Sequence, residues 1–200
     1  MRRIRYVVAM SLDGYIAGPN GEADWIIMDP EIDFDGIFAQ FDTFLLGRRT
    51  FEPMARSGSA GSPGMRTFVV SRTLQQRDHP KVTILGDGWE KAVSELREEE
   101  GKDIWLFGGG TLFRSLLDVG LVDSVEVAVV PVLLGGGVPL LPPPAARAPL
   151  VLTSHRIYKS GIASLEYAVE QASPAGGVTA TKARRRASTR KSPARTRDRR

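Results

Sequence analysis

Short apolar runs rich in β-branched and aromatic residues alternate with amphipathic segments between residues 4 and 117. Nearly continuous apolarity is typical of strands that are buried on both faces of a parallel sheet, whereas recurrence of apolar residues every three to four positions is typical of helices. The pattern predicts strands at residues 4–10, 43–47, 67–71, 82–85 and 104–107, and helices at residues 31–41, 49–56, 89–100 and 111–117. Asp87 and Glu90 have the spacing of a capping box, which predicts that one helix begins at Trp89.

The pattern changes after Asp123. Three further strands are predicted at residues 124–134, 150–158 and 164–169, and no helix separates the last two. Lys159-Ser160-Gly161 is typical of a turn, so this last pair is predicted to form a hairpin. Parallel strand–helix units followed by an antiparallel ending predict an α/β fold, with a mixed, mostly parallel sheet, helices on both faces and an antiparallel C-terminal hairpin.

The charge of the chain is concentrated at its end. Residues 171–200 contain ten Lys or Arg residues and a single acid, Asp198, for a net charge of +9. Because the whole chain carries +4, residues 1–170 carry a net −5. A segment with so little apolar surface cannot offset the entropy of ordering, so we predict a domain over residues 1–170 and a disordered basic tail over residues 171–200. The tail would attract polyanions in a salt-dependent manner, but it has no aromatic residue for base stacking.

Composition argues against several other classes of chemistry. The absence of cysteine excludes disulfides, thiolate metal sites and a cysteine nucleophile, and only two histidines are present, His79 and His155. The apolar runs are shorter than the roughly 20 residues that span a bilayer, and residues 6–10 are too short for the core of a signal peptide. We therefore expect a cytoplasmic protein with no metal site.

Gly108-Gly109-Gly110-Thr111-Leu112 is the strongest local signal, because it joins a predicted buried strand to a predicted helix. Glycine lets a ligand approach the backbone closely, and a helix start offers unpaired N–H groups and partial positive charge. This combination suits a pyrophosphate. The segment is neither a Rossmann fingerprint nor a P-loop, and a tight strand-to-helix turn without a ligand is the alternative.

Two more strand ends carry groups that suit phosphate. Gly47-Arg48-Arg49-Thr50 follows one predicted strand and Ser71-Arg72 follows another. Arginine forks bind phosphate oxygens in bidentate fashion, although surface arginines and polar strand ends are also common without a ligand. Because ligands of open α/β sheets bind at the carboxyl ends of the strands, the three segments together predict a ligand with separated phosphates, such as NADP.

Taken in order, these segments resemble the dihydrofolate reductase superfamily, and more closely its branch around the C-terminal reductase domain of riboflavin biosynthesis, the RibD type. The G-R-x-T segment at residues 47–50 and the glycines at residues 108–110 are characteristic of the superfamily. S-L-D-G at residues 11–14 and P-V-L-L-G-G-G at residues 131–137 point to the RibD-like branch. The resemblance covers residues 1–170. It implies an NADPH-dependent oxidoreductase that transfers hydride to a small pteridine- or aminopyrimidine-like substrate, of the dihydrofolate or 5-amino-6-(5-phosphoribosylamino)uracil type.

The resemblance also implies a set of site residues. Residues 47–50 and 108–112 would hold the pyrophosphate, Ser71 and Arg72 would contact the adenosine ribose and the 2′-phosphate, and Ala9 with residues 16–18 would flank the nicotinamide. The implied NADPH-binding residues are Ala9, Ile16, Gly18, Gly47, Arg48, Arg49, Thr50, Ser71, Arg72, Gly108, Gly109, Gly110, Thr111 and Leu112.

A group that protonates the substrate is harder to assign. Dihydrofolate reductases use a carboxylate on the first helix, where this chain has Glu31, Asp33 and Asp35. Two residues apart on a helix, Asp33 and Asp35 are not expected to face the same pocket. Asp13 lies close to the expected nicotinamide, although a turn alone would account for it. The candidate catalytic residues are Asp13, Asp33, Asp35 and Trp25, of which Trp25 would border the substrate or lie in the core.

Other functions stay open at this stage. RibD-type enzymes carry a glutamate directly before two glycines, where this chain has Gly108, and this departure leaves the riboflavin-pathway substrate unsettled. A non-catalytic NADP-binding module is one alternative. A nucleic-acid-associated protein that acts through the basic tail is another. The resemblance is also compatible with a homodimer.

Overall fold

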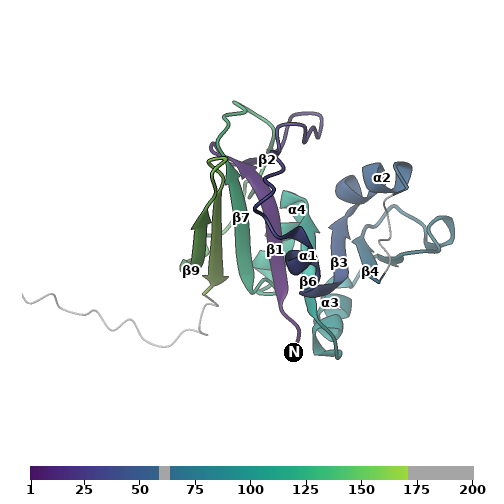
Figure 1. The fold of residues 1–200 in the computed structure, drawn as a ribbon. Helices are drawn as coiled ribbons and strands as arrows, with labels where there is room; N and C mark the ends of the chain where they lie inside the picture. The colour runs from purple at the N-terminus through teal and green to yellow at the C-terminus, as the bar shows by residue number, and fades with distance from the viewer. Residues whose placement is uncertain (59–63, 171–200) are drawn as a thin grey trace, which may run out of the picture.

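Eight strands form the central sheet of the part of the chain that the computed structural model describes, residues 1–58 and 64–170 (Figure 1). Their order across the sheet is β5-β4-β3-β6-β1-β7-β10-β9. The first six are parallel, and β10 runs antiparallel to both of its neighbours, as predicted. The strands are β1 (Ile4–Ser11), β3 (Phe41–Gly47), β4 (Arg66–Val70), β5 (Thr83–Leu85), β6 (Asp103–Gly108), β7 (Ser124–Val130), β9 (Leu150–Ile157) and β10 (Ala163–Val169).

Helices cover both faces of this sheet, and each face has its own apolar core. On one face lie α3 (Trp89–Glu98) and α4 (Gly110–Asp118), which bury Val93 and Phe113 against β1 and β6. On the other face lie α1 (Phe34–Phe38) and α2 (Arg48–Arg56), and here Phe51 packs with Leu46. A single 3₁₀ turn, η1 (Gln76–Asp78), follows β4. The mixed α/β architecture is therefore the one that the apolar pattern predicted.

Two predicted boundaries and one predicted cap were wrong, although α3 begins at Trp89 as predicted. The first helix spans only Phe34–Phe38, because Asp33 caps its start and Phe41 already pairs with Asp103 in the sheet. The strand predicted over residues 124–134 ends at Val130, directly before a proline, which cannot donate to a strand ladder. The predicted capping box is not formed, since Gly88 (φ 78°) occupies the N-cap position of α3 and no side chain caps that helix.

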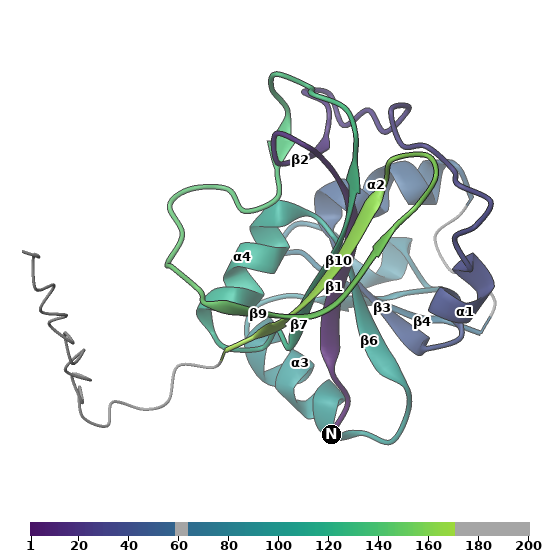
Figure 2. The ribbon, with the colours of Figure 1, turned by 60° about the vertical axis from the view of Figure 1, so that its left-hand side comes forward.

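A short two-stranded ribbon lies beside the main sheet and joins two distant segments. It consists of β2 (Tyr15–Ala17) and β8 (Val138–Pro139), which pair antiparallel. Gly110, the first residue of α4, lies so close to this ribbon that a Cβ there would be 2.5 Å from the carbonyl oxygen of Pro139. The ribbon is therefore seated on the start of α4, and Figure 2 shows it at the end of the molecule to which β1 points.

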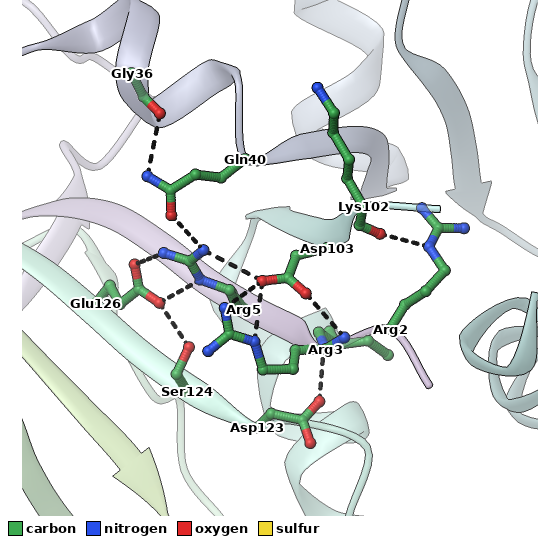
Figure 3. Close-up of polar contacts among 11 residues, drawn as sticks. Arg2, Arg3, Arg5, Gly36, Gln40, Lys102, Asp103, Asp123, Ser124 and Glu126 are labelled. Carbon is green, nitrogen blue, oxygen red and sulfur yellow. Dashed lines mark hydrogen bonds and ion pairs between the residues drawn. The ribbon is translucent and has the colours of Figure 1, made fainter. Parts of the chain in front are cut away.

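The basic N-terminus is bound within the fold by a charged network at the amino ends of the strands (Figure 3). Arg5 is 6% exposed, and its guanidinium donates to both carboxylate oxygens of Glu126, at 2.7 and 2.6 Å. It also donates to Gln40 at 2.7 Å, and Gln40 in turn donates to the carbonyl of Gly36 in α1. Arg5 thus connects β1 with β7 and with the end of α1, so the early basic residues have a structural task.

No helix among residues 1–58 and 64–170 is long and apolar enough to cross a membrane.

Candidate functional site

The strand ends that carry the predicted site meet at one edge of the sheet. The strands β4, β3, β6 and β1 are neighbours in this order and run parallel, so their carboxyl ends lie together. With neighbouring strands spaced by about 4.8 Å, these four ends span roughly 14 Å. The edge brings together residues 47–50, residues 71–72, residues 108–112 and the end of β1 near Ala9.

Two helix starts lie side by side within this edge. Gly47 is the N-cap of α2 and Gly109 is the N-cap of α4, and no side chain caps either helix. A Cβ on Gly47 would lie 3.6 Å from Cβ of Leu112, and a Cβ on Gly109 would lie 3.5 Å from Oγ1 of Thr50. The two glycine motifs therefore form a single surface, at which uncapped N–H groups and the partial charge of two helices suit an anion.

Each of the three consecutive glycines at this surface has a different environment. Gly108 has φ of 143°, a conformation that side-chain-bearing residues rarely adopt. Gly110 has no room for a side chain, because the backbone of Pro139 and Leu140 lies against it. Gly109 has φ of −97° and ψ of −174°, and only Thr50 lies near its missing Cβ. Gly109 therefore leaves open backbone next to the Thr50 hydroxyl.

The predicted phosphate-binding arginines are exposed around this surface. Arg48 forms an ion pair with Glu52 at 3.2 Å, one turn further along α2. Within the described residues, the side chains of Arg49 and Arg72 form neither a hydrogen bond nor an ion pair, so both cations are available to a ligand. Ser71 is buried, and its hydroxyl accepts hydrogen bonds from the backbone N–H groups of Thr73 and Leu74. Its contact with a ribose stays a prediction.

The residues predicted to flank the nicotinamide lie at the β1 side of the edge. Ala9 is paired with Ala128 of β7, so two methyl groups lie next to each other on one face of the sheet. Ile16 is in β2, which the ribbon brings to the start of α4, and Gly18 directly follows β2. Trp25 lies in the connection from β2 to α1 and is half-buried, and its indole N–H donates to the carbonyl of Glu22 at 3.2 Å.

Asp13 anchors the segment that follows β7. Its carboxylate accepts hydrogen bonds from the Ser11 hydroxyl at 2.6 Å and from the backbone N–H groups of Leu134 and Gly135 at 3.1 and 2.7 Å. These bonds, the Ser11 hydroxyl foremost, lower the pKa of Asp13 and favour its charged form. The geometry therefore gives Asp13 a structural task as a hydrogen-bond acceptor, and its part in catalysis stays a prediction.

Asp33 and Asp35 both line one hollow of about 580 Å³, so the expectation that they could not share a pocket was wrong. The reason is that Asp33 lies outside α1 as its N-cap, where it accepts a hydrogen bond from the N–H of Gly36 at 2.8 Å. In the described residues the Asp35 carboxylate has no hydrogen-bond partner. The volume is in the range of small-molecule sites, about 300–1,000 Å³. The lining residues are Met28, Asp29, Pro30, Glu31, Ile32, Asp33, Phe34 and Asp35.

Asp29 is a buried carboxylate that the sequence analysis missed. It is 4% exposed and accepts hydrogen bonds from the backbone N–H groups of Glu31 at 2.8 Å and Ser160 at 3.4 Å. Its pKa is lowered, chiefly by a hydrogen bond with the Ser160 side chain. The Asp29-Pro30 pair was an available signal, since Asp-Pro favours turn initiation and an Asp side chain often binds the N–H two residues on.

Most of the chain matches a known protein family and a known relative. The family described as RibD C-terminal domain matches residues 2–164. The uncharacterized protein YyaP of Bacillus subtilis (strain 168) is 35% identical over 178 residues, which are 83% of this chain and 94% of the relative.

Solved structures share the fold. A putative riboflavin biosynthesis protein from Shewanella sp. PV-4 superposes with a TM-score of 0.71 at 26% identity, over 86% of this chain and 100% of that one. Dihydrofolate reductase from Enterococcus faecalis, in complex with NADP(H) and RAB-propyl, superposes with a TM-score of 0.61 at 18% identity, over 84% of this chain and 97% of that one.

Proposed function

The chain belongs to the RibD C-terminal domain family, and on this premise we propose that it is an NADPH-dependent reductase that transfers hydride to a small pteridine- or aminopyrimidine-like heterocycle. One observation carries the proposal: the uncapped starts of α2 and α4 lie together, joined by Thr50 and Leu112, at the carboxyl edge of the sheet. Such a surface binds a pyrophosphate through backbone N–H groups.

The order of the strands matches the order of the parts of NADPH. Arg72 follows β4, the two glycine motifs follow β3 and β6, and Ala9 lies near the end of β1. Arg72 would contact the 2′-phosphate, residues 47–50 and 108–112 would hold the pyrophosphate, and Ala9 would support the nicotinamide. The roughly 14 Å from β4 to β1, at about 4.8 Å per strand, suits a dinucleotide laid across the edge.

The cofactor supplies the hydride, and the work of the chain is to position the two reactants and to exclude water. The paired methyl groups of Ala9 and Ala128 are small enough for a flat ring to lie against the sheet at this point. In the hollow of residues 28–35, carboxylates such as Asp35 can accept hydrogen bonds from ring amino groups, while Met28 and Phe34 supply apolar contact. These features favour an amino-substituted heterocycle as the substrate.

Titration of the full chain with NADPH, followed by tryptophan fluorescence, tests the cofactor. We expect saturable binding and weaker binding of NADH, because Arg72 recognises the additional phosphate. Arg72→Ala should weaken NADPH binding on the order of ten-fold, the equivalent of one charge-assisted contact, and leave NADH binding unchanged. Absence of binding at millimolar NADPH would overturn the proposal.

Turnover separates an enzyme from a non-catalytic NADP-binding module. We expect loss of nicotinamide absorbance when dihydrofolate or the phosphoribosylaminouracil substrate is added with NADPH. Tight NADPH binding without turnover of either compound would favour the binding module. Residues 171–200 lie outside the described part of the chain, so the disordered tail, its polyanion contact and the division at residue 170 stay predictions, as does the homodimer.

A further inference from the structure

The connection from β2 to α1, residues 18–33, crosses one face of the sheet and is here named the strap. In Figure 1 it descends in front of β1 to reach α1. It is held at its start by the β2–β8 ribbon and at its end by α1, whose Phe38 packs on Trp105 at 5.0 Å between ring centroids. Trp105 pairs with Arg5, so it lies on the same face as Ala9, four residues further along β1.

Between these ends, Trp25, Ile26 and Ile32 are partly buried, but no residue of the strap belongs to either apolar core. Ile27 and Met28 are 44% and 68% exposed, and α1 contains no fully buried residue. A segment with so little buried apolar surface belongs to the low-stability part of a fold. Its position therefore depends on polar contacts in the middle of the strap.

Those polar contacts are made with the turn of the C-terminal hairpin, residues 158–161, and with the strand before it. The Asp29 carboxylate binds Ser160, as described above, and is almost completely buried. The Glu31 carboxylate forms ion pairs with Nζ of Lys159 at 2.7 Å and with Nη2 of Arg156 at 3.8 Å. The tip of the hairpin lies beside the strap in Figure 2.

The same two residues also border the hollow. Asp29 and Glu31 are among the residues that line it, next to Asp33 and Asp35. Each residue therefore borders the hollow, and its carboxylate has a hydrogen bond or ion pair to the β9–β10 hairpin. The shape of this wall of the hollow is consequently set by a turn more than a hundred residues away along the chain.

The strand register shows what the strap covers. Ala9 is paired with Ala128, Ala128 with Ser164, and Ser164 with Arg156, so these four residues form a row across β1, β7, β10 and β9. Directly paired residues point to the same face of a sheet. The ion pair of Glu31 with Arg156 therefore ties the strap to the far end of the row that begins at the predicted nicotinamide-binding residue.

We propose that the β9–β10 turn positions the substrate site, with Asp29 and Glu31 as positioning residues that hold the strap over the row from Ala9 to Arg156. This inference rests on the proposed function and adds the element that shapes the substrate side. The buried contact of Asp29 is the fixed anchor, and the exposed ion pair of Glu31 with Lys159 sets how firmly the strap is closed. Loss of either contact should weaken binding of the heterocycle. It should not weaken binding of NADPH, which the glycine motifs after β3 and β6 would hold.

Hydrogen exchange of the full chain without cofactor tests the contact itself. We expect Glu31→Gln and Lys159→Met to accelerate exchange of peptides from residues 24–33 about three- to ten-fold, because local opening is no longer opposed by the ion pair. Asp29→Asn should have a larger effect. Lys159→Arg keeps the cation and should restore the original exchange rate.

Lys91→Met is the matched control. It breaks an exposed ion pair of similar kind, Lys91 with Glu95 at 3.6 Å, on α3 at the other face of the sheet. It should leave exchange of the strap unchanged. If Asp29→Asn does not fold, Glu31→Gln and Lys159→Met carry the test, since both positions are partly or fully exposed.

Binding measurements on the same variants test the assignment to the substrate side. We expect the KM for dihydrofolate with NADPH to rise about five-fold or more, with kcat changed less and the Kd of NADPH unchanged, the result for lost substrate positioning. Unchanged exchange in all three variants would overturn the inference, as would equal weakening of NADPH and dihydrofolate. Because exchange needs neither ligand, failure of the reductase proposal is seen separately, as absence of NADPH binding in the unmodified chain.

Discussion

Individual residues at the carboxyl edge differ in whether the fold or a ligand accounts for them. Gly108 and Gly110 are required by the backbone, one through its positive φ and the other through the contact with Pro139. Gly47 is not required in this way, since its φ of −86° and ψ of 158° are ordinary and a Cβ there would make only normal contacts. Two properties of glycine suit this position: it is tolerated as the N-cap of α2, and it lets a ligand approach the backbone closely.

Gly47→Ala tests this distinction. The added methyl group would occupy the surface between the two helix starts, so we expect the Kd of NADPH to rise on the order of ten-fold, or 1.4 kcal/mol. Alanine is a poorer N-cap than glycine, so the free energy of unfolding should also fall, by about 0.5–1 kcal/mol. Fluorescence titration and thermal denaturation measure the two quantities. Gly110→Ala is the contrasting variant, and it should destabilise the fold by about 1–3 kcal/mol through overpacking. Equal loss of stability in both variants would argue against a ligand-based role for Gly47.

Asp13 makes a pH-dependent contribution to stability. Its folded-state pKa lies below the ordinary value of 3.8, so its favourable contribution is complete well above that value and is lost as the pH falls through the folded pKa. Asp13→Asn should therefore lower the urea midpoint at pH 7 and have a smaller effect at pH 3. Asp24→Asn is the control, because the side chain of Asp24 has no hydrogen bond in the described residues. A difference between wild type and Asp13→Asn that is equal at both pH values would contradict the prediction.

At the scale of elements, Arg5 joins three parts of the fold that are far apart in the sequence. It connects β1 with β7 through Glu126 and with the end of α1 through Gln40 (Figure 3). The side chains of Arg5 and Glu126 are only 8% and 11% exposed, so neither charge is well solvated if its partner is removed. The pair therefore specifies how α1 lies against the sheet, and α1 in turn fixes the end of the strap.

Removal of one side chain of the Arg5–Glu126 pair should lower the free energy of unfolding more than replacement of both side chains. We expect Glu126→Gln to lower the free energy of unfolding by about 1–3 kcal/mol, because the largely buried Arg5 guanidinium then keeps only its longer ion pair with Asp103, at 3.3 Å. The double variant Arg5→Met with Glu126→Leu should recover most of this loss. Urea unfolding of the two single variants and the double variant measures the coupling. Additive losses would show that the ion pair contributes little to the fold.

At the scale of the whole molecule, the described residues end in a strand that is paired within the sheet. The last strand, β10, ends at Val169, and the N–H of Glu170 still donates to the carbonyl of Pro149 at 3.1 Å. The residues of the candidate site lie between positions 9 and 160. The nine net positive charges of residues 171–200 therefore belong to a part of the sequence that the proposed reductase chemistry does not use.

Deletion of residues 171–200 should remove polyanion binding and leave NADPH binding unchanged. We expect the Kd of NADPH and the melting temperature to stay the same, while retention on a heparin column falls to the level of an acidic protein, since residues 1–170 carry a net −5. Retention of the full chain should decrease steeply with salt. Loss of NADPH binding in the truncated chain would show that the boundary at residue 170 is wrong.

The sequence alone determined the elements and the main cofactor signals, because these depend on local properties. Apolar runs such as residues 104–107 predicted buried strands, and the glycines at residues 47 and 108–110 predicted two helix starts suited to phosphate. The carboxyl-edge rule then predicted that they meet, and the strand order confirms this. The order of motifs also indicated the family.

Only the tertiary structure decided which residues form the proposed substrate side. The length of α1 depends on the pairing of Phe41 with β6, and the shared hollow of Asp33 and Asp35 depends on where α1 begins. The burial of Asp29 depends on Ser160, a partner 131 positions away. A local sequence pattern cannot predict such a partner. The two residues come into contact only when the strands between them have formed the complete sheet.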